Sequence, residues 1–283
     1  MLSTPKSFEQ LKKGYGFRKA LFKAHVRRSI PWPIRTRLKS PIFIIGSSRS
    51  GTTMLTDILA AATEVCSFSE KPIVRRHMWN MVKFPDSLSY NLPQLEKTLT
   101  RLSGIKPEQR LLEKTPGHSL IAGALATYFP DGSFIHIIRD GRDVSNSMLG
   151  HSWISRELNE EVEVFWFPYL PQVYQERWPK LDLWERGVLR WAVYVTAARK
   201  AQSATERYFE TSYEEVCKDP QQHIYRLFNF LELTVSSDCK QEIAKVRPVS
   251  SKTDKRKNLS ERHQHFYEEA LSNFGFSSLQ VKS

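Results

Sequence analysis

The chain has 283 residues, of which 40% are hydrophobic and 25% charged, the balance of an ordinary soluble protein that is long enough to bury a core. No stretch approaches the roughly 18 apolar residues of a membrane-spanning helix, and the N-terminus lacks the pattern of a secretory leader, so we expect a cytoplasmic protein. The three cysteines Cys66, Cys217 and Cys239 are scattered and never spaced for a metal, so we expect reduced thiols and no metal site.

The net charge of +12 is concentrated at the N-terminus. Residues 1–40 hold eleven bases against the single acid Glu9, so the rest is close to neutral and we expect no nucleic-acid partner. Apolar residues at near-helical spacing predict a basic amphipathic helix before Pro31; they are Leu11, Tyr15, Phe22 and Val26. We expect this helix to pack on the body, and the alternative is peripheral contact with an anionic membrane at its inner face. The expected division is a basic extension over 1–40 and one domain over 41–283.

The first regular element of the domain is a strand. "PIFIIG", residues 41–46, is a fully apolar run typical of a buried parallel strand, and a helix is expected from Thr52 to Ala62. The turn between them has the GxxxxG spacing of a phosphate-binding loop, although Thr52 stands at the position of the Walker lysine and the only cation in the loop is Arg49. We therefore predict an anion site formed by loop N–H groups and a helix N-terminus.

Further strands and helices alternate along the chain. Strands are expected at "FIHII" (134–138), followed by a helix through Met148, and at "RYFETSY" (207–213). Asp219 and Pro220 predict the start of a helix that runs through Leu231. Two more helices are expected around 187–204 and 261–273. This alternation predicts an α/β fold of three layers, with a central parallel sheet flanked by helices, as in P-loop proteins.

The end of the second apolar strand bears on the ligand. A Mg²⁺-dependent kinase needs the Walker lysine and an acidic metal ligand at this point. Here the strand is followed by Arg139, with Asp140 after it. A cation suits a second phosphate better than a metal ion, which indicates a ligand with two anionic groups and no Mg²⁺ between them.

The segments "FIIGSSRSGTTML" and "FIHIIRDGRDVSNSM" together resemble the two cofactor motifs of the sulfotransferase superfamily, which uses 3′-phosphoadenosine 5′-phosphosulfate (PAPS). The chain is similar to the bacterial and Golgi-type members, which have Arg at the position of Arg49. The resemblance implies a sulfotransferase domain over 41–283, in which Arg139 and Ser147 bind the 3′-phosphate. It also implies that Tyr213, in "YEEVCKDPQQHIYRLFNFLEL", contacts the adenine region, with packing in the core as an equal alternative. The implied 5′-phosphosulfate site comprises Arg49, Ser50, Gly51, Thr52 and Thr53.

The resemblance further implies how the reaction is catalysed. Donors must face the sulfonate and the leaving phosphate, and Arg49 offers a planar fork of them. A general base must take the acceptor proton. Glu70 matches the base of the Arg-type enzymes, and we expect Phe68 and Pro72 to shield it partly from water. The simpler alternative is a surface carboxylate paired with Lys71.

Two further residues are candidates at this site. His118 competes with Glu70 as the base, but we expect it near a helix start, where it positions the acceptor. Lys114 is expected beside the transferred sulfonate as a second cation, and the alternative is a strand-end pair with Glu113.

The expected reaction is transfer of the sulfuryl group from PAPS, without metal, to a hydroxyl (less readily an amine) of a carbohydrate, lipid or other small molecule. A P-loop kinase-like phosphotransferase and a non-catalytic module that binds adenosine 3′,5′-bisphosphate (PAP) are the alternatives. "VFWFPYLPQVY" (164–174) could line an acceptor pocket or form a lid or oligomer contact. The C-terminal stretch lacks the family's glycine- and tryptophan-containing loop, and the bases that could replace it on the 3′-phosphate are Lys252, Lys255, Arg256 and Lys257.

Overall fold

The computed structural model of the chain describes residues 37–159, 164–248 and 259–276. The helix expected before Pro31 and the basic cluster expected between 252 and 257 both lie outside the described residues.

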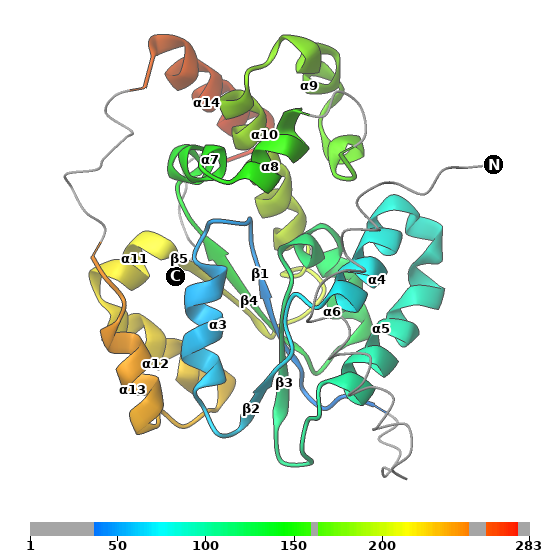
Figure 1. Cartoon of the computed structure of the whole chain (residues 1–283), viewed down its shortest axis with the longest axis vertical. Helices are drawn as coiled ribbons and strands as arrows, with labels where there is room; N and C mark the ends of the chain where they lie inside the picture. The colour runs from blue at the N-terminus through cyan, green and yellow to red at the C-terminus, as the bar shows by residue number, and fades with distance from the viewer. Residues whose placement is uncertain (1–36, 160–163, 249–258, 277–283) are drawn as a thin grey trace. The chain divides into compact units, whose positions relative to one another are not determined.

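Five parallel strands form one sheet in the order β2–β3–β1–β4–β5 (Figure 1). Ile42 of β1 lies opposite Leu112 of β3 on one side and Ser133 of β4 on the other. All four residues of β1 are buried, because helices cover both faces of the sheet, and this explains the uninterrupted apolar run. The strands are β1 (Ile42–Ile45), β2 (Val65–Ser67), β3 (Arg110–Lys114), β4 (Ser133–Ile138) and β5 (Tyr208–Ser212).

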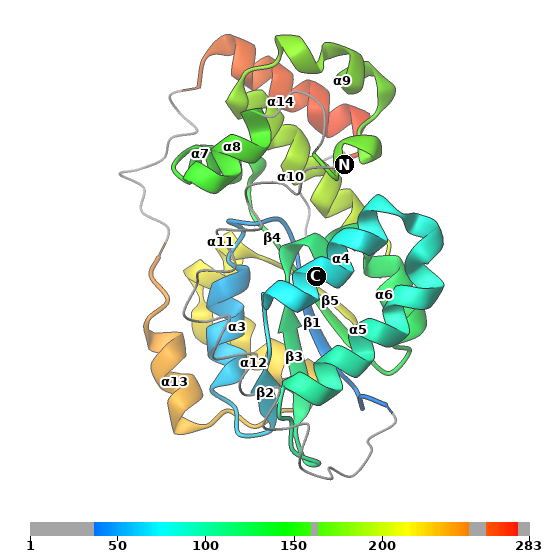
Figure 2. The same cartoon turned by 45° about the vertical axis from the view of Figure 1, so that its right-hand side comes forward.

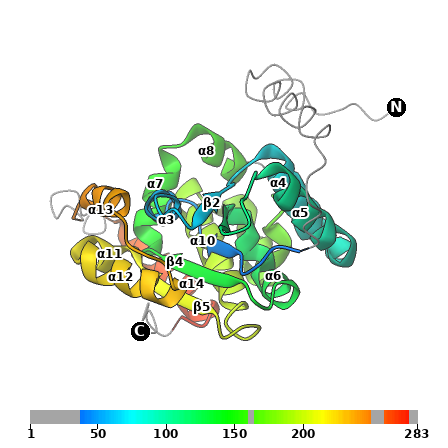
Figure 3. The same ribbon diagram turned by 90° about the horizontal axis from the view of Figure 1, so that it is seen from below.

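Helices cover the two faces as separate groups (Figures 2 and 3). Ile42 and Ile44 share one apolar cluster with α3 (Thr52–Ala60), α11 (Tyr213–Lys218), α12 (Pro220–Leu231) and α13 (Ser237–Ala244). Phe43 and Ile45 share the other cluster with α4 (Pro72–Lys83), α5 (Leu88–Leu102) and α6 (Ala122–Tyr128). The predicted three-layer α/β fold is confirmed, since alternate residues of each strand serve opposite layers.

A further group of helices lies beyond the carboxyl ends of the strands (Figure 1). It contains α7 (Gly141–Leu149), α8 (Ser152–Asn159), α9 (Gln172–Arg177) and α14 (Glu261–Asn273), assembled around α10 (Leu183–Arg199). α10 also contacts α6 and the turn η2 (Pro116–Ile121), which connects this group to the sheet. The other short 3₁₀ turns are η1 (Pro85–Ser87), η3 (Phe167–Tyr169) and η4 (Trp178–Lys180).

The aromatic segment 164–174 belongs to the core of this helical group. Trp166 and Tyr174 are fully buried, and the Trp166 ring meets the edge of Trp178 at 5.5 Å between centroids. Neither of these two rings is free to line a pocket or an oligomer contact, and the role of the segment as a lid stays a prediction.

Most element boundaries agree with the sequence, and the deviations have local causes. The expected strands 134–138 and 207–213 correspond to β4 and β5, and the helices 220–231 and 261–273 to α12 and α14. The Asp219 carboxylate accepts the Gln222 N–H at 3.0 Å, as an N-cap should. α10 starts at Leu183 rather than near 187, because Asp182 and Glu185 form a capping box. Among the described residues, no helix is both long and apolar enough to cross a bilayer.

A polar network is buried between β4, β5 and α10. The ring Nδ1 of His136 lies 2.7 Å from the Tyr208 hydroxyl, which donates to the Glu210 carboxylate at 2.7 Å, and Arg199 donates to the same carboxylate. Burial lowers the pKa of His136, although the contact with Glu210 opposes this effect. His136 is therefore held neutral in a fully buried position.

This network makes stability depend on pH. Below about pH 6.5 the unfolded chain protonates this histidine, while the folded chain resists protonation, so the free energy of unfolding should fall as the pH falls. One such group contributes a slope of at most about 1.4 kcal/mol per pH unit. Urea unfolding of His136→Gln between pH 7.5 and about pH 5 should give a flatter profile than the wild type, whatever its absolute stability. Identical slopes would contradict the assignment of a neutral buried histidine.

Candidate anion-binding and catalytic site

The predicted site residues meet at the carboxyl edge of the sheet. Gly46 follows β1, Glu70 follows β2, Lys114 ends β3, Arg139 follows β4 and Tyr213 follows β5. Parallel strands end at one edge, and the strand order reverses between β1 and β4, the point at which open α/β sheets bind ligands.

The loop after β1 is held by a close backbone approach. Gly46 has φ of +144°, and a Cβ atom there would lie 2.5 Å from the carbonyl oxygen of Ile137 in β4. The Gly46 N–H donates to the Ser119 hydroxyl at 2.8 Å, and that hydroxyl donates to the Gly46 carbonyl at 3.1 Å. The position therefore requires glycine, and Ser119 locks the start of the loop.

The loop ends at the N-terminus of α3. Gly51 has φ of +95°, and a Cβ atom there would lie 2.6 Å from the ring of Tyr213. α3 has no side-chain cap, so the N–H groups of its first turn remain available to an anion in the loop. Thr52 is buried at this turn and Thr53 is exposed.

Hydrogen bonds connect the two predicted phosphate motifs. Arg49, itself at φ of +74°, donates from Nε to the Ser147 hydroxyl of α7 at 3.0 Å. Arg139 donates from its guanidinium to the Arg49 carbonyl at 3.2 Å and stacks on the Tyr213 ring at 4.5 Å. Burial raises the pKa of Tyr213, which keeps the phenol neutral beside this cation. Tyr213 thus borders the site and is not simply a core residue.

Two buried polar atoms of these motifs lack a hydrogen-bond partner among the described residues: Ser50 Oγ and Arg139 Nε. Buried donors without partners are costly, so each atom is a candidate contact for a bound anion.

Lys114 and Glu70 form an ion pair at the other end of the loop. The Lys114 ammonium lies 2.8 Å from the Glu70 carboxylate and donates to the Thr53 hydroxyl at 3.3 Å. The Lys114 side chain is 5% exposed and that of Glu70 47% exposed. Glu70 therefore pairs with Lys114 rather than Lys71. About half of the Glu70 side chain is open to water and Pro72 is exposed, so any shielding of the carboxylate is partial.

Glu113 lies on the opposite face of β3 and does not pair with Lys114. Its carboxylate contacts His118 Nδ1 at 2.5 Å and accepts from the Thr115 hydroxyl at 2.6 Å. His118 is fully buried in η2, and its Nε2 has no partner among the described residues. This burial argues against a direct role of His118 as the base or in positioning an acceptor.

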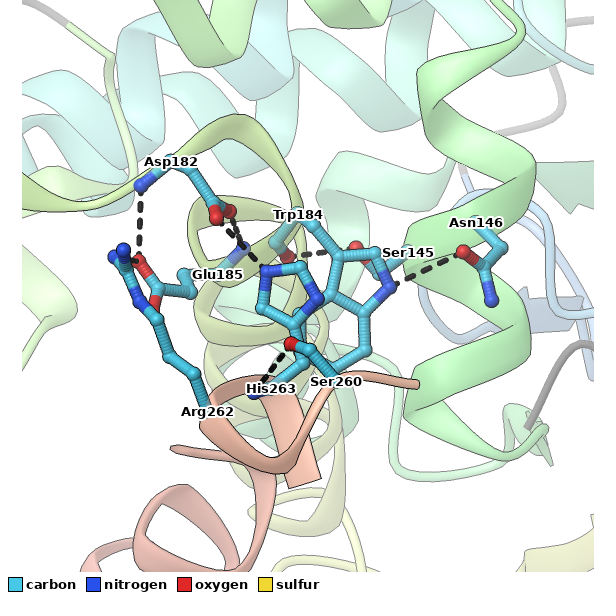
Figure 4. Close-up of polar contacts among 8 residues, drawn as sticks. All are labelled: Ser145, Asn146, Asp182, Trp184, Glu185, Ser260, Arg262 and His263. Atoms are coloured by element: carbon cyan, nitrogen blue, oxygen red, sulfur yellow. Dashed lines mark hydrogen bonds and ion pairs between the residues drawn. The ribbon is translucent and has the colours of Figure 1, made fainter. Parts of the chain in front are cut away.

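The helix that carries Ser147 is fixed by α10 and α14 (Figure 4). The indole N–H of Trp184 donates to the Asn146 side chain at 3.2 Å, and the backbone carbonyl of Trp184 accepts from the Ser145 hydroxyl at 2.7 Å. The same indole stacks on His263 of α14, with 4.4 Å between ring centroids. At the start of α7, Trp191 of α10 donates to the Arg139 carbonyl at 3.0 Å.

The three residues Asp182, Glu185 and His263 are close enough in this region to suggest a metal site. However, Arg262 donates twice to Glu185, at 2.9 and 2.8 Å, and His263 Nε2 lies 2.8 Å from Asp182. Burial would raise the pKa of Asp182, but its hydrogen bonds with His263 and the Glu185 N–H bring it below its usual value. The cluster is an ion-paired junction of helix ends, and we assign no metal to it.

Some residues that build the site were not among the sequence candidates. The Ser119 hydroxyl accepts a hydrogen bond from the Gly46 N–H, and the Ser69 hydroxyl accepts one from the backbone N–H of Lys114 at 3.0 Å. A serine in a loop has no periodicity to mark it, so neither could be found from one sequence. Trp184 and Trp191 stand in a helical pattern, which predicts burial but not the atom that each indole N–H meets.

Comparisons with known proteins bear on the family and on the fold of the chain. The family model described as "Sulfotransferase domain" matches residues 39–278. An uncharacterized protein of Aquifex aeolicus (strain VF5) is 22% identical in an alignment of length 236 that covers 75% of this chain and 28% of that protein, so the chain spans just over a quarter of that relative. The sulfotransferase domain from the curacin biosynthetic pathway is 19% identical, with a TM-score of 0.56 over 85% of this chain and 99% of that one. A sulfotransferase from Mycobacterium avium is 14% identical, with a TM-score of 0.53 over 96% and 88% of the two chains. These structures share the fold.

The close approach at Gly46 can be tested by adding one methyl group. Gly46→Ala should lower the free energy of unfolding by about 2–4 kcal/mol, because the new Cβ meets a backbone oxygen that cannot move aside. Gly150→Ala is the control: its φ is −75° and the nearest atom lies at 3.7 Å, so its stability should stay within about 1 kcal/mol of wild type. Equal stability of the two variants in urea unfolding would show that the loop relaxes freely.

Proposed function

This chain belongs to the sulfotransferase family, and we propose that it transfers the sulfuryl group of PAPS to a hydroxyl acceptor. The observation that carries the proposal is the junction of the two anion-binding motifs, where Arg49 bonds Ser147 and Arg139 bonds the Arg49 carbonyl. A ligand at this edge meets two guanidinium groups, one from each motif, which suits a nucleotide with a 5′-phosphosulfate and a 3′-phosphate.

The residues at each point fit one end of PAPS. The 5′-phosphosulfate is assigned to Arg49, Ser50, Gly51, Thr52 and Thr53, with the uncapped first turn of α3. The 3′-phosphate is assigned to Arg139 and Ser147. Tyr213 borders the nucleotide and holds the Arg139 guanidinium by stacking. The unpartnered atoms, Ser50 Oγ and Arg139 Nε, are donors from which this ligand would accept hydrogen bonds.

A Mg²⁺-dependent kinase fits these residues less well. The carboxylate nearest the end of β4 is Asp140, and it caps α7 while accepting the Arg142 side chain at 3.0 and 2.7 Å. A carboxylate committed to a helix cap and a guanidinium is a poor metal ligand. A PAP-binding module without catalysis remains an outcome of the experiments below.

Glu70 is proposed as the general base and Lys114 as the cation beside the sulfonate. The acceptor oxygen attacks sulfur as its proton passes to the Glu70 carboxylate, and the bond between sulfur and the 5′-phosphate oxygen breaks to release PAP. Lys114 touches both Thr53 of the loop and Glu70, so it lies between the nucleotide site and the base. Its charge can stabilise the oxygens on which negative charge develops. His118 is proposed to support η2 from its buried pair with Glu113.

The two-anion assignment predicts selective loss of affinity. Arg139→Ala should weaken PAP binding more than tenfold, because a charged hydrogen bond contributes roughly 1.5–3 kcal/mol, while affinity for adenosine 5′-phosphosulfate should change little. Ser147→Ala should also weaken PAP binding, by a smaller factor. The control is Arg226→Ala, which changes an exposed arginine of α12. Calorimetry measures all of these. Equal losses for both nucleotides would make Arg139 structural, and tighter binding of ATP–Mg²⁺ than of PAP would overturn the sulfotransferase proposal.

The base assignment predicts a loss of turnover without loss of binding. Glu70→Gln should reduce kcat by about 10²-fold or more and leave PAP affinity intact, as expected for a lost general base. Turnover is measured with radiolabelled PAPS and acceptors found by screening extracts of the source organism. Glu108→Gln, an exposed carboxylate away from the site, is the control. Near-normal turnover of Glu70→Gln beside an inactive but folded His118→Ala would reverse the assignment.

A further inference from the structure

Helix α4 carries large apolar side chains on its surface. Ile73 is 42% exposed, Trp79 40% and Phe84, the C-cap residue, 55%. Arg76 and Lys83 are exposed on the same helix. We call these five residues the α4 patch.

The five side chains form one surface. Val74, Met78, Met81 and Val82 are buried, so they mark the face of α4 that packs on the core. The spacing 73, 76, 79 and 83 places the patch on the opposite side of the helix. The Lys83 ammonium lies 4.8 Å from the Trp79 ring and 5.9 Å from the Phe84 ring, which makes the C-terminal half of the patch continuous.

The charge of the patch restricts what can cover it. Residues 71–90 contain four bases, Lys71, Arg75, Arg76 and Lys83, and the single acid Asp86. A second copy of the patch has the same sign and would be repelled. The partner must therefore be anionic and must also accept aliphatic and aromatic side chains.

We propose that the α4 patch docks on the headgroup layer of an anionic lipid bilayer. Rings of Trp and Phe and an aliphatic side chain enter the boundary between headgroups and acyl chains, while Arg76 and Lys83 meet lipid phosphates. A surface that bound phosphate groups alone would gain nothing from the exposed aliphatic side chain of Ile73.

The position of α4 links docking to the proposed reaction. Its N-cap is Lys71, the residue after Glu70, and the helix is only about 18 Å long. A bilayer on this face would hold the proposed base close to the membrane surface, because Glu70 directly precedes the N-cap of α4. Resting on the proposed function, the inference assigns the acceptor to a hydroxyl of a lipid or lipid-borne group rather than a freely soluble molecule.

Co-sedimentation of the full chain with vesicles, without nucleotide, tests the docking. Vesicles of phosphatidylcholine with phosphatidylserine should bind the wild type, and phosphatidylcholine alone should bind it weakly. Trp79→Ser and the pair Arg76→Glu with Lys83→Glu should each reduce partition by about tenfold or more. The matched controls lie on helices of the opposite layer: Tyr225→Ser, 40% exposed, and the pair Lys218→Glu with Lys240→Glu should bind as wild type.

Tryptophan fluorescence gives a second readout. Trp166, Trp178, Trp184 and Trp191 are buried, so brominated lipid should quench Trp79 in preference to them. Trp79→Phe should keep most of the binding and lose that part of the quenching.

Unchanged partition of Trp79→Ser and of the Arg76/Lys83 pair overturns the inference, and would place any vesicle binding in residues 1–40. Partition that falls only for the charge pair, with Trp79→Ser as wild type, also overturns it, because the contact would then fit any polyanion, nucleic acid included. PAP affinity of every patch variant should equal that of wild type, so failure of docking and failure of the sulfotransferase proposal remain distinguishable.

Discussion

The backbone of Gly46 runs so close to the carbonyl oxygen of Ile137 that no side chain fits between them, and the ligand-binding edge depends on this contact. It sets the direction in which the chain leaves β1, the strand enclosed by β3 and β4. Turned in this direction, the loop brings Arg49 to Ser147 on one side and Thr53 to Lys114 on the other. One steric constraint in the middle of the sheet therefore aligns groups that belong to β3 or follow β1 and β4.

Among the residues that the structure describes, the charges at this edge are incompletely balanced. Lys114 has a carboxylate partner, whereas Arg49 bonds a neutral hydroxyl and Arg139 bonds a carbonyl and an aromatic face. Guanidinium groups tolerate such settings because they stay charged and are weakly hydrated. A site built in this way favours a ligand that brings its own negative charges, and the neutral partners keep the arginines oriented until it arrives.

The sequence was informative wherever a local pattern determines a structure. The apolar run predicts strand β1, the spacing of the glycines after it predicts the phosphate-binding type of loop, and Asp219 with Pro220 predicts the start of α12. All three are found. The pairing of side chains between elements was not predictable in the same way. Glu70 with Lys114, and Glu113 with His118, depend on the alternation of β3 and on the register of β2, which one sequence does not reveal. The burial of Trp166 depends on packing between segments, such as its contact with the Trp178 ring, so an aromatic segment suggested a pocket where there is a core.

The junction of α14 with α10 has a consequence for how the protein is made. Trp184 and Trp191, which fix α7 and the Arg139 carbonyl, are covered by His263 and Tyr267 of the last helix. A nascent chain that has emerged only as far as α13 exposes both indoles. It also lacks Arg262, which donates to the Glu185 carboxylate in the folded protein. Helix α14 therefore completes the packing behind the ligand site only after α13 has been made, and until then the unfinished chain presents aromatic surface on which chaperones can act.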